Sequence, residues 1–353
     1  MPARNGQIID AVRKGLNMAD NRQLGPVLLH AETDIFAVLD GAQFDDLPMA
    51  LFEGDFFHRP LYLDRGTGTA DQLRTAPQLV WLDRDRKHPL RDRTEENYPI
   101  DESVLDRLFS LVEERPAVVF WQCEGGGERL YRHLRRINKV LIPALANIDR
   151  GESYERSPLA QEDDEPKEYE FVIFRHPDSN VMAQVTPSLT PPNISRILGP
   201  ARQILFYADA DWGDKPMRVR HSDDLPSPPS GPLKLSLDEI TAMERVRLRA
   251  IRRRRVAYLQ ETCTQETEGV PRERLEEHIL ISEETGSKLG LVSEAAHCRW
   301  AFIVCKTGGR VLKSNEALNF IAHKGKNPDS QVKQFMADAM DWMKAQAQIG
   351  RQL

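Results

Sequence analysis

The sequence predicts an α/β lobe of the α+β kind with a mixed sheet, followed by an all-α lobe. Up to about residue 207, short apolar runs rich in β-branched and aromatic residues alternate with stretches of helical period. Residues 222–233 are dense in Pro, Ser and Gly, which is the composition of a linker. After this segment every apolar pattern has the helical period. We therefore expect one domain at residues 1–221 and a helical domain at residues 234–353.

The centre of the first domain is predicted at residues 116–141. Residues 117–121 form an uninterrupted apolar run, AVVFW, which is typical of a central strand buried on both faces. Glycines at 125–127 end this strand, because glycine adopts turn conformations that other residues resist. From Glu128 to Leu141 the apolar residues recur with the spacing of one helical face. The sequence therefore predicts an amphipathic helix lying on a sheet, with Trp121 and the glycines at its core.

A strand, a glycine turn and a helix are also the outline of a phosphate-binding site. No Lys-Ser/Thr pair follows the glycines, and GGGER lacks the spacing of a dinucleotide fingerprint. Glu124 and Glu128 would also repel an anion. We interpret the glycines as a structural turn.

The remaining elements follow from the same patterns. In the first domain, strands are predicted at residues 34–41, 78–82, 171–174 and 203–207, and helices at 7–18, 47–57, 101–112 and 193–198. Residues 147–168 are polar and acidic, which indicates an exposed insertion. Ser236 and Glu239 form a capping box that begins a helix running to about residue 262. Further helices are predicted at residues 271–290, 293–307, 314–323 and 330–348, and no strand is expected after Leu233.

Composition restricts the class of protein. The net charge of −6 disfavours a general nucleic-acid binder, whose affinity comes from a surplus of Lys and Arg. The four cysteines form no C-x-x-C pair, which fits a reducing compartment. The first residues carry charges without an apolar core, and no segment is apolar enough to span a membrane. We therefore expect a cytoplasmic protein that does not insert into a membrane.

Several groups of side chains are candidates for chemistry or binding. The arginine stretch 245–255 is expected to be a solvated helix face, or else a surface for nucleic acid or for an acidic protein segment. Acidic residues near Asp40 have the residue types of an acid–base pair, although such clusters are usually turn chemistry. The histidines and cysteines show no metal-ligand spacing, and no G-x-S-x-G is present. The aromatic residues Phe52, Phe56 and Phe57 are expected in the core or, where exposed, in a protein-binding patch.

Several short segments occur together in one order. They are residues 35–42 (IFAVLDGA), 76–80 (APQLV), Trp121 with the glycines, 133–135 (HLR), Phe174-Arg175 with Asp178, and 198–200 (LGP). Over residues 34–207 this order resembles the type VI secretion effector chaperone or adaptor family, and a helical tail suits the second lobe of that family. The motif residues are Asp40, Gly41, Pro77, Trp121, Gly126, His133, Leu134, Asp178, Gly199 and Pro200. The family usually has an aromatic pair between the Arg and the Asp and Pro-Arg after the Asp, and this chain departs from both features.

The resemblance implies a protein that is not an enzyme and needs no cofactor. Such a protein binds one toxic effector in the cytoplasm, keeps it soluble and helps to load it onto the spike-tip protein of the secretion machine. The candidate partner-binding residues are Phe52, Phe56, Phe57, Arg135, Arg175, Arg245, Arg249 and Arg252. Arg135 is expected to form a buried ion pair, or else to bind a carboxylate of the partner. The alternatives are a hydrolytic enzyme that uses carboxylates near Asp40 and a nucleic-acid-binding regulator that uses the arginine helix.

Overall fold

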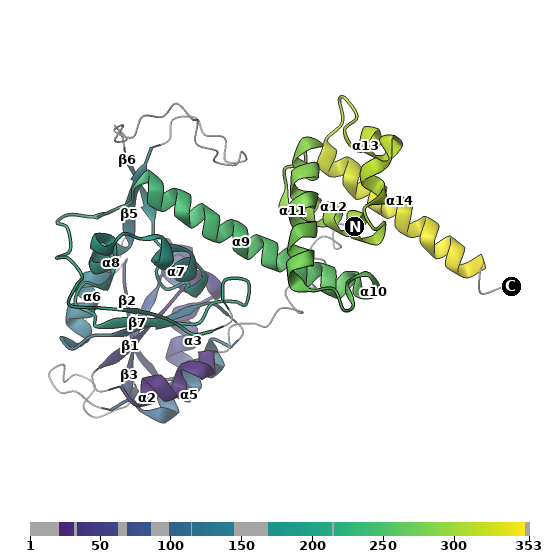
Figure 1. Cartoon of the computed structure of the whole chain (residues 1–353). Coiled ribbons are helices and arrows are strands. Elements are labelled where there is room, and N and C mark those ends of the chain that lie inside the picture. The colour runs from purple at the N-terminus through teal and green to yellow at the C-terminus, as the bar shows by residue number, and fades with distance from the viewer. Residues whose placement is uncertain are drawn as a thin grey trace. The chain divides into compact units, whose positions relative to one another are not determined.

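The computed structural model describes residues 21–31, 34–62, 69–85, 99–113, 115–144, 169–213 and 215–349 (Figure 1). The chain divides into two compact units, of which the first ends at Leu248 and the second begins at Arg249. This division falls within helix α9, Leu237–Thr262, and therefore lies beyond the proline-rich segment that the sequence indicated as a linker. The predictions at residues 7–18 and 147–168 lie outside the described residues.

The first unit is built on a six-stranded sheet with the order β2-β3-β1-β4-β7-β8. The strands are β1 Ile35–Leu39, β2 Phe56–Pro60, β3 Gln78–Asp85, β4 Val118–Gln122, β7 Gln203–Phe206 and β8 Met217–Arg220. Every neighbouring pair in this sheet is antiparallel, so the expectation of a mixed sheet is wrong here. Strand composition does not encode direction, because direction depends on how each connection returns to the sheet. The prediction of a buried central strand is confirmed, since all of β4 is buried.

Helices cover both faces of this sheet, and Figure 1 shows the two groups on opposite sides. On one face lie α6 Gly126–Ile137, α7 Ser179–Val185 and α8 Pro191–Leu198; on the other lie α2 Gly25–Leu29, α3 Leu47–Glu53 and α5 Glu102–Leu111. Side chains of β1 alternate between the two cores: Phe36 and Val38 pack under α6, whereas Ala37 and Leu39 face α5. Short helical segments complete the unit: η1 Asn21–Leu24, η2 Gly41–Gln43, α4 Ala70–Arg74 and η3 Thr186–Ser188.

A second, three-stranded sheet has the order β6-β5-β9 and is mixed. Its strands are β5 Lys139–Pro143, β6 Tyr169–Ile173 and β9 Leu233–Lys234. The predicted helix to Leu141 therefore ends too late, because α6 stops at Ile137 and Leu141 pairs with Phe171 of β6. Leu141 has the helical spacing from Leu134 by coincidence, and the run Val140 to Pro143 has the β-branched composition of a strand.

One more boundary and one further strand differ from the sequence prediction. The helix predicted at residues 47–57 ends at Glu53, and Asp55 has a positive φ of 57°, which reverses the chain before β2 begins at Phe56. Strand β8 was not predicted, because its alternating Met-Arg-Val-Arg pattern carries few apolar residues.

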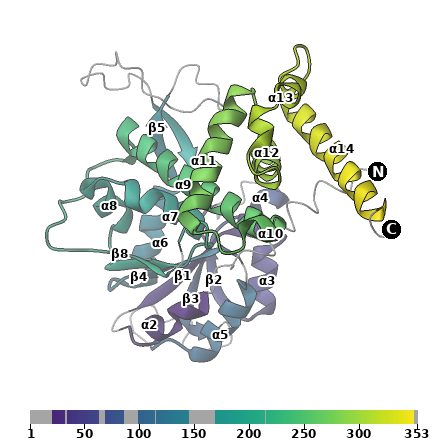
Figure 2. The ribbon, with the colours of Figure 1, turned by 45° about the vertical axis from the view of Figure 1, so that its right-hand side comes forward.

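The second unit is all α in its described part, as predicted. Its helices are the end of α9, α10 Thr264–Thr267, α11 Arg272–Lys288, α12 Glu294–Lys306, η4 Arg310–Lys313, α13 Asn315–Ile321 and α14 Pro328–Ile349. Figure 2 shows α12 between α11 and α14, and the buried Trp300 of α12 is the largest side chain of this core. The helices of the described residues include none with the length and apolar character of a membrane span.

The capping box is confirmed. The Ser236 N–H donates to Glu239 Oε2 at 2.8 Å, and the Glu239 N–H donates to Ser236 Oγ at 3.2 Å. The buried carboxylate of Glu239 also accepts from the backbone N–H of Thr190 at 2.8 Å and from Asn193 Nδ2 at 2.9 Å. The start of α9 is therefore fixed to the start of α8.

Candidate functional site

Polar side chains meet at one end of the strands of the six-stranded sheet. Because neighbouring strands are antiparallel, the carboxyl ends of β1, β2 and β7 lie at this end of the sheet together with the amino ends of β3 and β4. Asp40 follows β1 directly, and Tyr62 lies just after β2. The loop between β6 and α7 brings Arg175 and Asp178 to the same place. We call Asp40, Arg175 and Asp178 the carboxylate–arginine cluster.

The guanidinium of Arg175 joins two buried carboxylates. Its Nη2 contacts Asp40 Oδ2 and lies 3.3 Å from Asp178 Oδ2. The other oxygen of Asp40 accepts from the Ala42 N–H at 3.3 Å, and Asp178 Oδ1 caps α7 by accepting from the Asn180 N–H at 2.9 Å. The side chains of Asp40 and Asp178 are 5% and 8% exposed, whereas that of Arg175 is 42% exposed. One side of the guanidinium is therefore fixed in the protein and the other reaches solvent.

Burial shifts the ionisation of this cluster. It raises the pKa of Asp178 to about 6, although two backbone N–H groups and Arg175 favour the carboxylate. Burial opposes the charge of Arg175, but the hydrogen bond and charge of Asp40 outweigh burial and raise the pKa of Arg175. Burial, and then the charge of Asp40, raise the pKa of Tyr62. The cluster therefore contains a carboxyl group that titrates close to neutral pH.

A second cluster joins α6 to β4 and to the loops before α7 and after α8, and it consists of Trp121, His133, His176 and Gly199. His133 Nε2–H donates to the Ile197 carbonyl at 2.7 Å, and His176 Nε2–H donates to Asn138 Oδ1 at 2.9 Å. The ring centroid of Trp121 lies 6.3 Å from that of His133 and 6.0 Å from that of His176. We call these residues the histidine–tryptophan cluster.

Both histidines of this cluster are uncharged at neutral pH. Burial lowers the pKa of His133 to about 4 and the pKa of His176 to about 3. Gly199 has a φ of 53°, and a Cβ on it would lie 2.2 Å from Cε1 of His133. The glycine is therefore required both by the backbone conformation and by the imidazole that packs on it.

Other motif residues also meet in space. A Cβ on Gly41 would lie 2.5 Å from the carbonyl carbon of Thr75, so the Asp-Gly motif packs directly against the Ala-Pro motif. The Pro77 carbonyl accepts from the Leu61 N–H at 2.9 Å, and the Pro200 carbonyl accepts from the Cys123 thiol at 3.6 Å. Leu134 is fully buried, and Gly126 begins α6 with a φ of 75°. Of the motifs that carry the resemblance, the Asp-Gly and Ala-Pro segments contact one another, as do the residues of the two clusters described above.

The predicted partner-binding aromatic residues lie in three different environments. Phe52 on α3 is 55% exposed. Phe56 is 1% exposed and lies in the core, so its side chain is not accessible to a partner. Phe57 is half-buried, with its ring centroid 5.0 Å from that of Trp81. Phe52 is thus the member of this group that the surface presents.

The predicted arginines also differ in position. Arg135 is exposed and donates to the Tyr131 hydroxyl at 3.2 Å, so the expectation of a buried ion pair is wrong. Arg245 and Arg249 are exposed. Arg252 Nε lies 2.8 Å from Glu283 Oε2, and the buried Arg255 lies 2.6 Å from Oε1 of the same carboxylate. Part of the arginine stretch therefore stabilises the helical unit, because Glu283 of α11 joins two arginines of α9.

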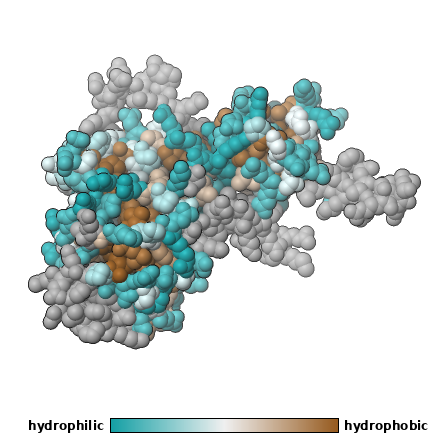
Figure 3. Space-filling model, turned by 60° about the horizontal axis from the view of Figure 1, so that its bottom comes forward, coloured by the Kyte–Doolittle hydropathy of each residue, from teal (hydrophilic) through white to brown (hydrophobic). Residues whose placement is uncertain are grey.

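One exposed apolar feature was not found from the sequence. Phe171 and Ile173 of β6 are 61% and 70% exposed, whereas the sequence predicted a strand at residues 171–174 without indicating which side chains reach solvent. The sequence carried no signal for this exposure, because the only charged residue of the strand, Glu170, shares the face of Val172, which packs on the core. Figure 3 shows one face of the molecule, on which hydrophobic side chains gather over the sheet unit within a mostly hydrophilic surface.

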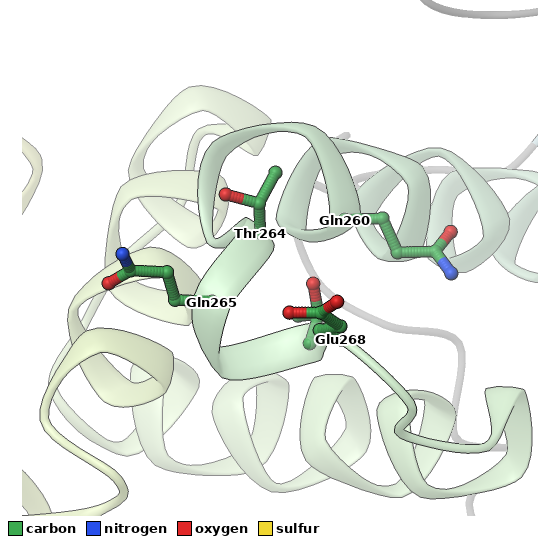
Figure 4. A pocket seen from close by; sticks show the side chains of 5 residues that line it. Gln260, Thr264, Gln265 and Glu268 are labelled. Carbon is green, nitrogen blue, oxygen red and sulfur yellow. The ribbon is translucent and has the colours of Figure 1, made fainter.

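Two hollows lie on the surface of the helical unit. One, of about 410 Å³, is lined by Gln260, Thr264, Gln265, Thr267 and Glu268, whose side chains point in different directions (Figure 4). The other, of about 660 Å³, includes Lys306, whose ammonium group lies 2.7 Å from Glu266. Within the described ranges, no three His, Cys, Asp or Glu side chains are grouped so that they could hold a metal ion.

Comparison of the chain with known proteins found no family model, no curated protein and no solved structure that matches it.

Proposed function

We propose that this protein is a chaperone and adaptor of a type VI secretion system. It binds one toxic effector in the cytoplasm, keeps that effector soluble and helps to load it onto the spike-tip protein. The observation that carries the proposal is the meeting of the motif residues. Asp40 and Asp178 contact the same guanidinium, Gly199 packs on His133, and the His133 ring contacts the ring of Trp121. The resemblance to the chaperone family thus rests on residues that act together.

The surface of the sheet unit gives a physical reason for chaperone activity. An effector segment that later enters another protein or a membrane exposes apolar area before secretion, and covering this area prevents aggregation. Phe52, Phe171 and Ile173 present apolar side chains to solvent on this unit. Exposed aromatic and aliphatic side chains of this kind are frequent at protein interfaces.

The two alternative functions have less support from the contacts. Both oxygens of Asp40 are engaged, one by Arg175 and one by the Ala42 N–H, which is the environment of a structural carboxylate. In the arginine helix, Arg252 and Arg255 are engaged by Glu283, which reduces the positive charge available to phosphate groups.

Deletion of the gene in the native cell tests the proposed function. Candidate effectors encoded beside it are followed for solubility and for co-purification with the spike-tip protein. We expect one effector to become insoluble and to be lost from the spike, and we expect the wild-type protein to restore both properties. The proposal fails if every neighbouring effector stays equally soluble and equally spike-associated without this protein.

A further inference from the structure

The outer edge of β6 carries backbone groups that point away from its own sheet. The Phe174 N–H donates to the Asn138 carbonyl at 2.9 Å, so this pair is hydrogen-bonded, and the register makes residues 172 and 140 the next such pair. In an antiparallel ladder, hydrogen-bonded and non-hydrogen-bonded pairs alternate. The N–H and C=O groups of Tyr169, Phe171 and Ile173 therefore point away from β5.

The hydrogen bond between β5 and β9 supports these directions of the backbone groups. The Leu141 carbonyl accepts from the Leu235 N–H at 2.9 Å, so the backbone groups of Leu141 point toward β9 and not toward β6. Among the residues that the structure describes, β6 pairs with β5 alone. We call the outward backbone groups of Tyr169, Phe171 and Ile173, together with their side chains, the β6 edge.

The side chains of the β6 edge make one face of the small sheet apolar. Phe171 and Ile173 project from the face opposite to Val140 and Val172, which pack on the core. Leu141 lies directly across from Phe171 in the register and extends this apolar face. Soluble proteins usually protect a strand edge of this kind with charged residues, proline or a bulge, because it can pair with another chain.

The charged side chains that the described strands place on this face are positive. Lys139 is exposed and lies across from Ile173, and Lys234 lies with its ammonium group 4.0 Å from the centroid of the Tyr169 ring. The register places both lysines on the same face of the sheet as Phe171, whereas Glu170 lies on the opposite face. An acidic partner segment is therefore complementary to this surface.

We propose that an extended, acidic segment of the partner protein adds to β6 as a further strand and places alternate apolar side chains over Phe171 and Ile173. Backbone hydrogen bonds to the β6 edge supply affinity, and the apolar face and the two lysines select the sequence. The proposal depends on the proposed function only in naming the partner as the effector.

The framework holds β6 in position for this role. The residues that follow β6 directly are Phe174, Arg175 and His176, which are fixed to the Asn138 carbonyl, to Asp40 and to the Asn138 side chain. The strand is thus anchored to the six-stranded sheet before a partner binds. Because β6 is already ordered, the entropic cost of ordering this strand does not reduce the affinity for a partner.

The test uses the purified full-length chain and a short capped peptide in which Val and Ile alternate with Thr and Asp. A control peptide has the same composition with its apolar residues at helical spacing. Two further peptides carry N-methyl groups on either the apolar or the intervening residues. In an added antiparallel strand the apolar residues bond to β6, and in a parallel strand the intervening residues do so.

We expect the alternating peptide to bind, the helical-pattern peptide to bind at least about tenfold more weakly, and one N-methylated peptide to lose binding while the other keeps it. Equal binding of the alternating and helical-pattern peptides overturns the proposal. Equal effects of the two methylation patterns also overturn it, because strand addition uses alternate backbone groups only.

Variants of the protein separate the backbone from the side chains. Ile173→Pro removes an outward N–H without removing a hydrogen bond to β5, and Phe171→Thr with Ile173→Thr removes apolar area while keeping β-propensity. The matched control is Leu280→Thr with Ile281→Thr on α11, where the two side chains are 45% and 48% exposed. We expect each β6 variant to weaken peptide binding about tenfold and the α11 variant to leave it unchanged.

Amide hydrogen exchange identifies what occupies the edge. The Phe171 and Ile173 amides should exchange quickly in the free protein and become protected with the alternating peptide. Protection in the free monomer means that another segment of this chain covers β6, and protection that grows with protein concentration means that a second copy does; either result overturns the proposal. Because the assay contains no effector, failure of the peptide experiment would overturn strand addition at β6 but not the proposed function. Failure of the gene-deletion experiment would overturn the proposed function but not strand addition.

Discussion

The Arg175 guanidinium contacts the Asp40 carboxylate although 135 positions separate the two residues. The contact ties the loop after β6 to the end of β1, and Asp178 completes it from the start of α7. Arg202 provides a comparison, because it is equally exposed, at 43%, but pairs at 3.3 Å with Glu124, whose side chain is 60% exposed. The two ion pairs differ in the burial of the acid and not of the arginine.

Replacement of Arg175 should therefore destabilise the sheet unit more than replacement of Arg202. Arg175→Gln leaves two buried carboxylates without their cation, and we expect a loss of about 2 kcal/mol in the free energy of unfolding, reduced by the partial exposure of Arg175. Arg202→Gln should change this free energy by less than about 1 kcal/mol. Urea denaturation of both variants measures the difference, and equal losses would contradict a structural role for the carboxylate–arginine cluster.

Gly199 combines a left-handed backbone with a neighbour that leaves no room for a side chain. We expect Gly199→Ala to lower the free energy of unfolding by about 3 kcal/mol, from backbone strain and from the contact with His133. Gly231 is the control, since its φ is 87° and a Cβ there would meet nothing within 4 Å. Gly231→Ala should lose only the strain, about 1 kcal/mol. Thermal and urea unfolding check both values, and similar losses would show that the His133 ring yields easily.

The buried histidines should make the sheet unit less stable in acid. His133 has a pKa of about 4 in the folded protein against 6.5 when unfolded, and His176 a pKa of about 3. Both pKa values are lowered, so the unfolded chain binds more protons, and stability present above about pH 6.5 is lost as the pH falls toward 4. For His133 the shift corresponds to about 3 kcal/mol.

Asp178 acts in the opposite direction. Its folded pKa of about 6 lies above the unfolded value of 3.8, so its contribution to stability is complete below pH 3.8 and is lost as the pH rises through 6. Asp178→Asn should therefore steepen the loss of stability between pH 6.5 and 4, whereas His133→Gln should reduce it. The measurement is the free energy of unfolding in urea at several pH values. Parallel pH profiles for the wild type and both variants would refute the assignment.

Glu283 should be essential to the helical unit because it pairs with both Arg252 and Arg255. Glu283→Gln leaves the buried Arg255 without its carboxylate, and we expect a loss of about 3 kcal/mol. The neighbouring Glu284 is the control, because it pairs with Lys288 at 2.6 Å and the two side chains are 68% and 70% exposed. Glu284→Gln should cause a much smaller loss, because solvent screens this exposed ion pair. Amide hydrogen exchange in α11 and α12 at increasing urea concentration measures the stability of this unit, and equal losses would mean that Glu283 is not a structural carboxylate.

The sequence by itself determined the elements whose signal is local. The buried run at β4, the caps at Asp101 and Ser236, and the all-α second unit could be read from composition and spacing, because apolar period and capping depend on nearby residues. The motif residues from Asp40 to Pro200 could also be selected from the sequence, but only as separate segments.

Only the tertiary structure decided which of these segments meet and which side chains reach solvent. The loop after β6 brings Arg175 to Asp40 at the end of β1, and the register of β5 and β6 leaves Phe171 and Ile173 exposed. Residues 171–174 and residues 118–122 both have the apolar composition of a strand, but all of residues 118–122 are buried whereas Phe171 and Ile173 are exposed. The physical reason is that burial and pairing depend on neighbours distant in the chain, which a local pattern does not contain.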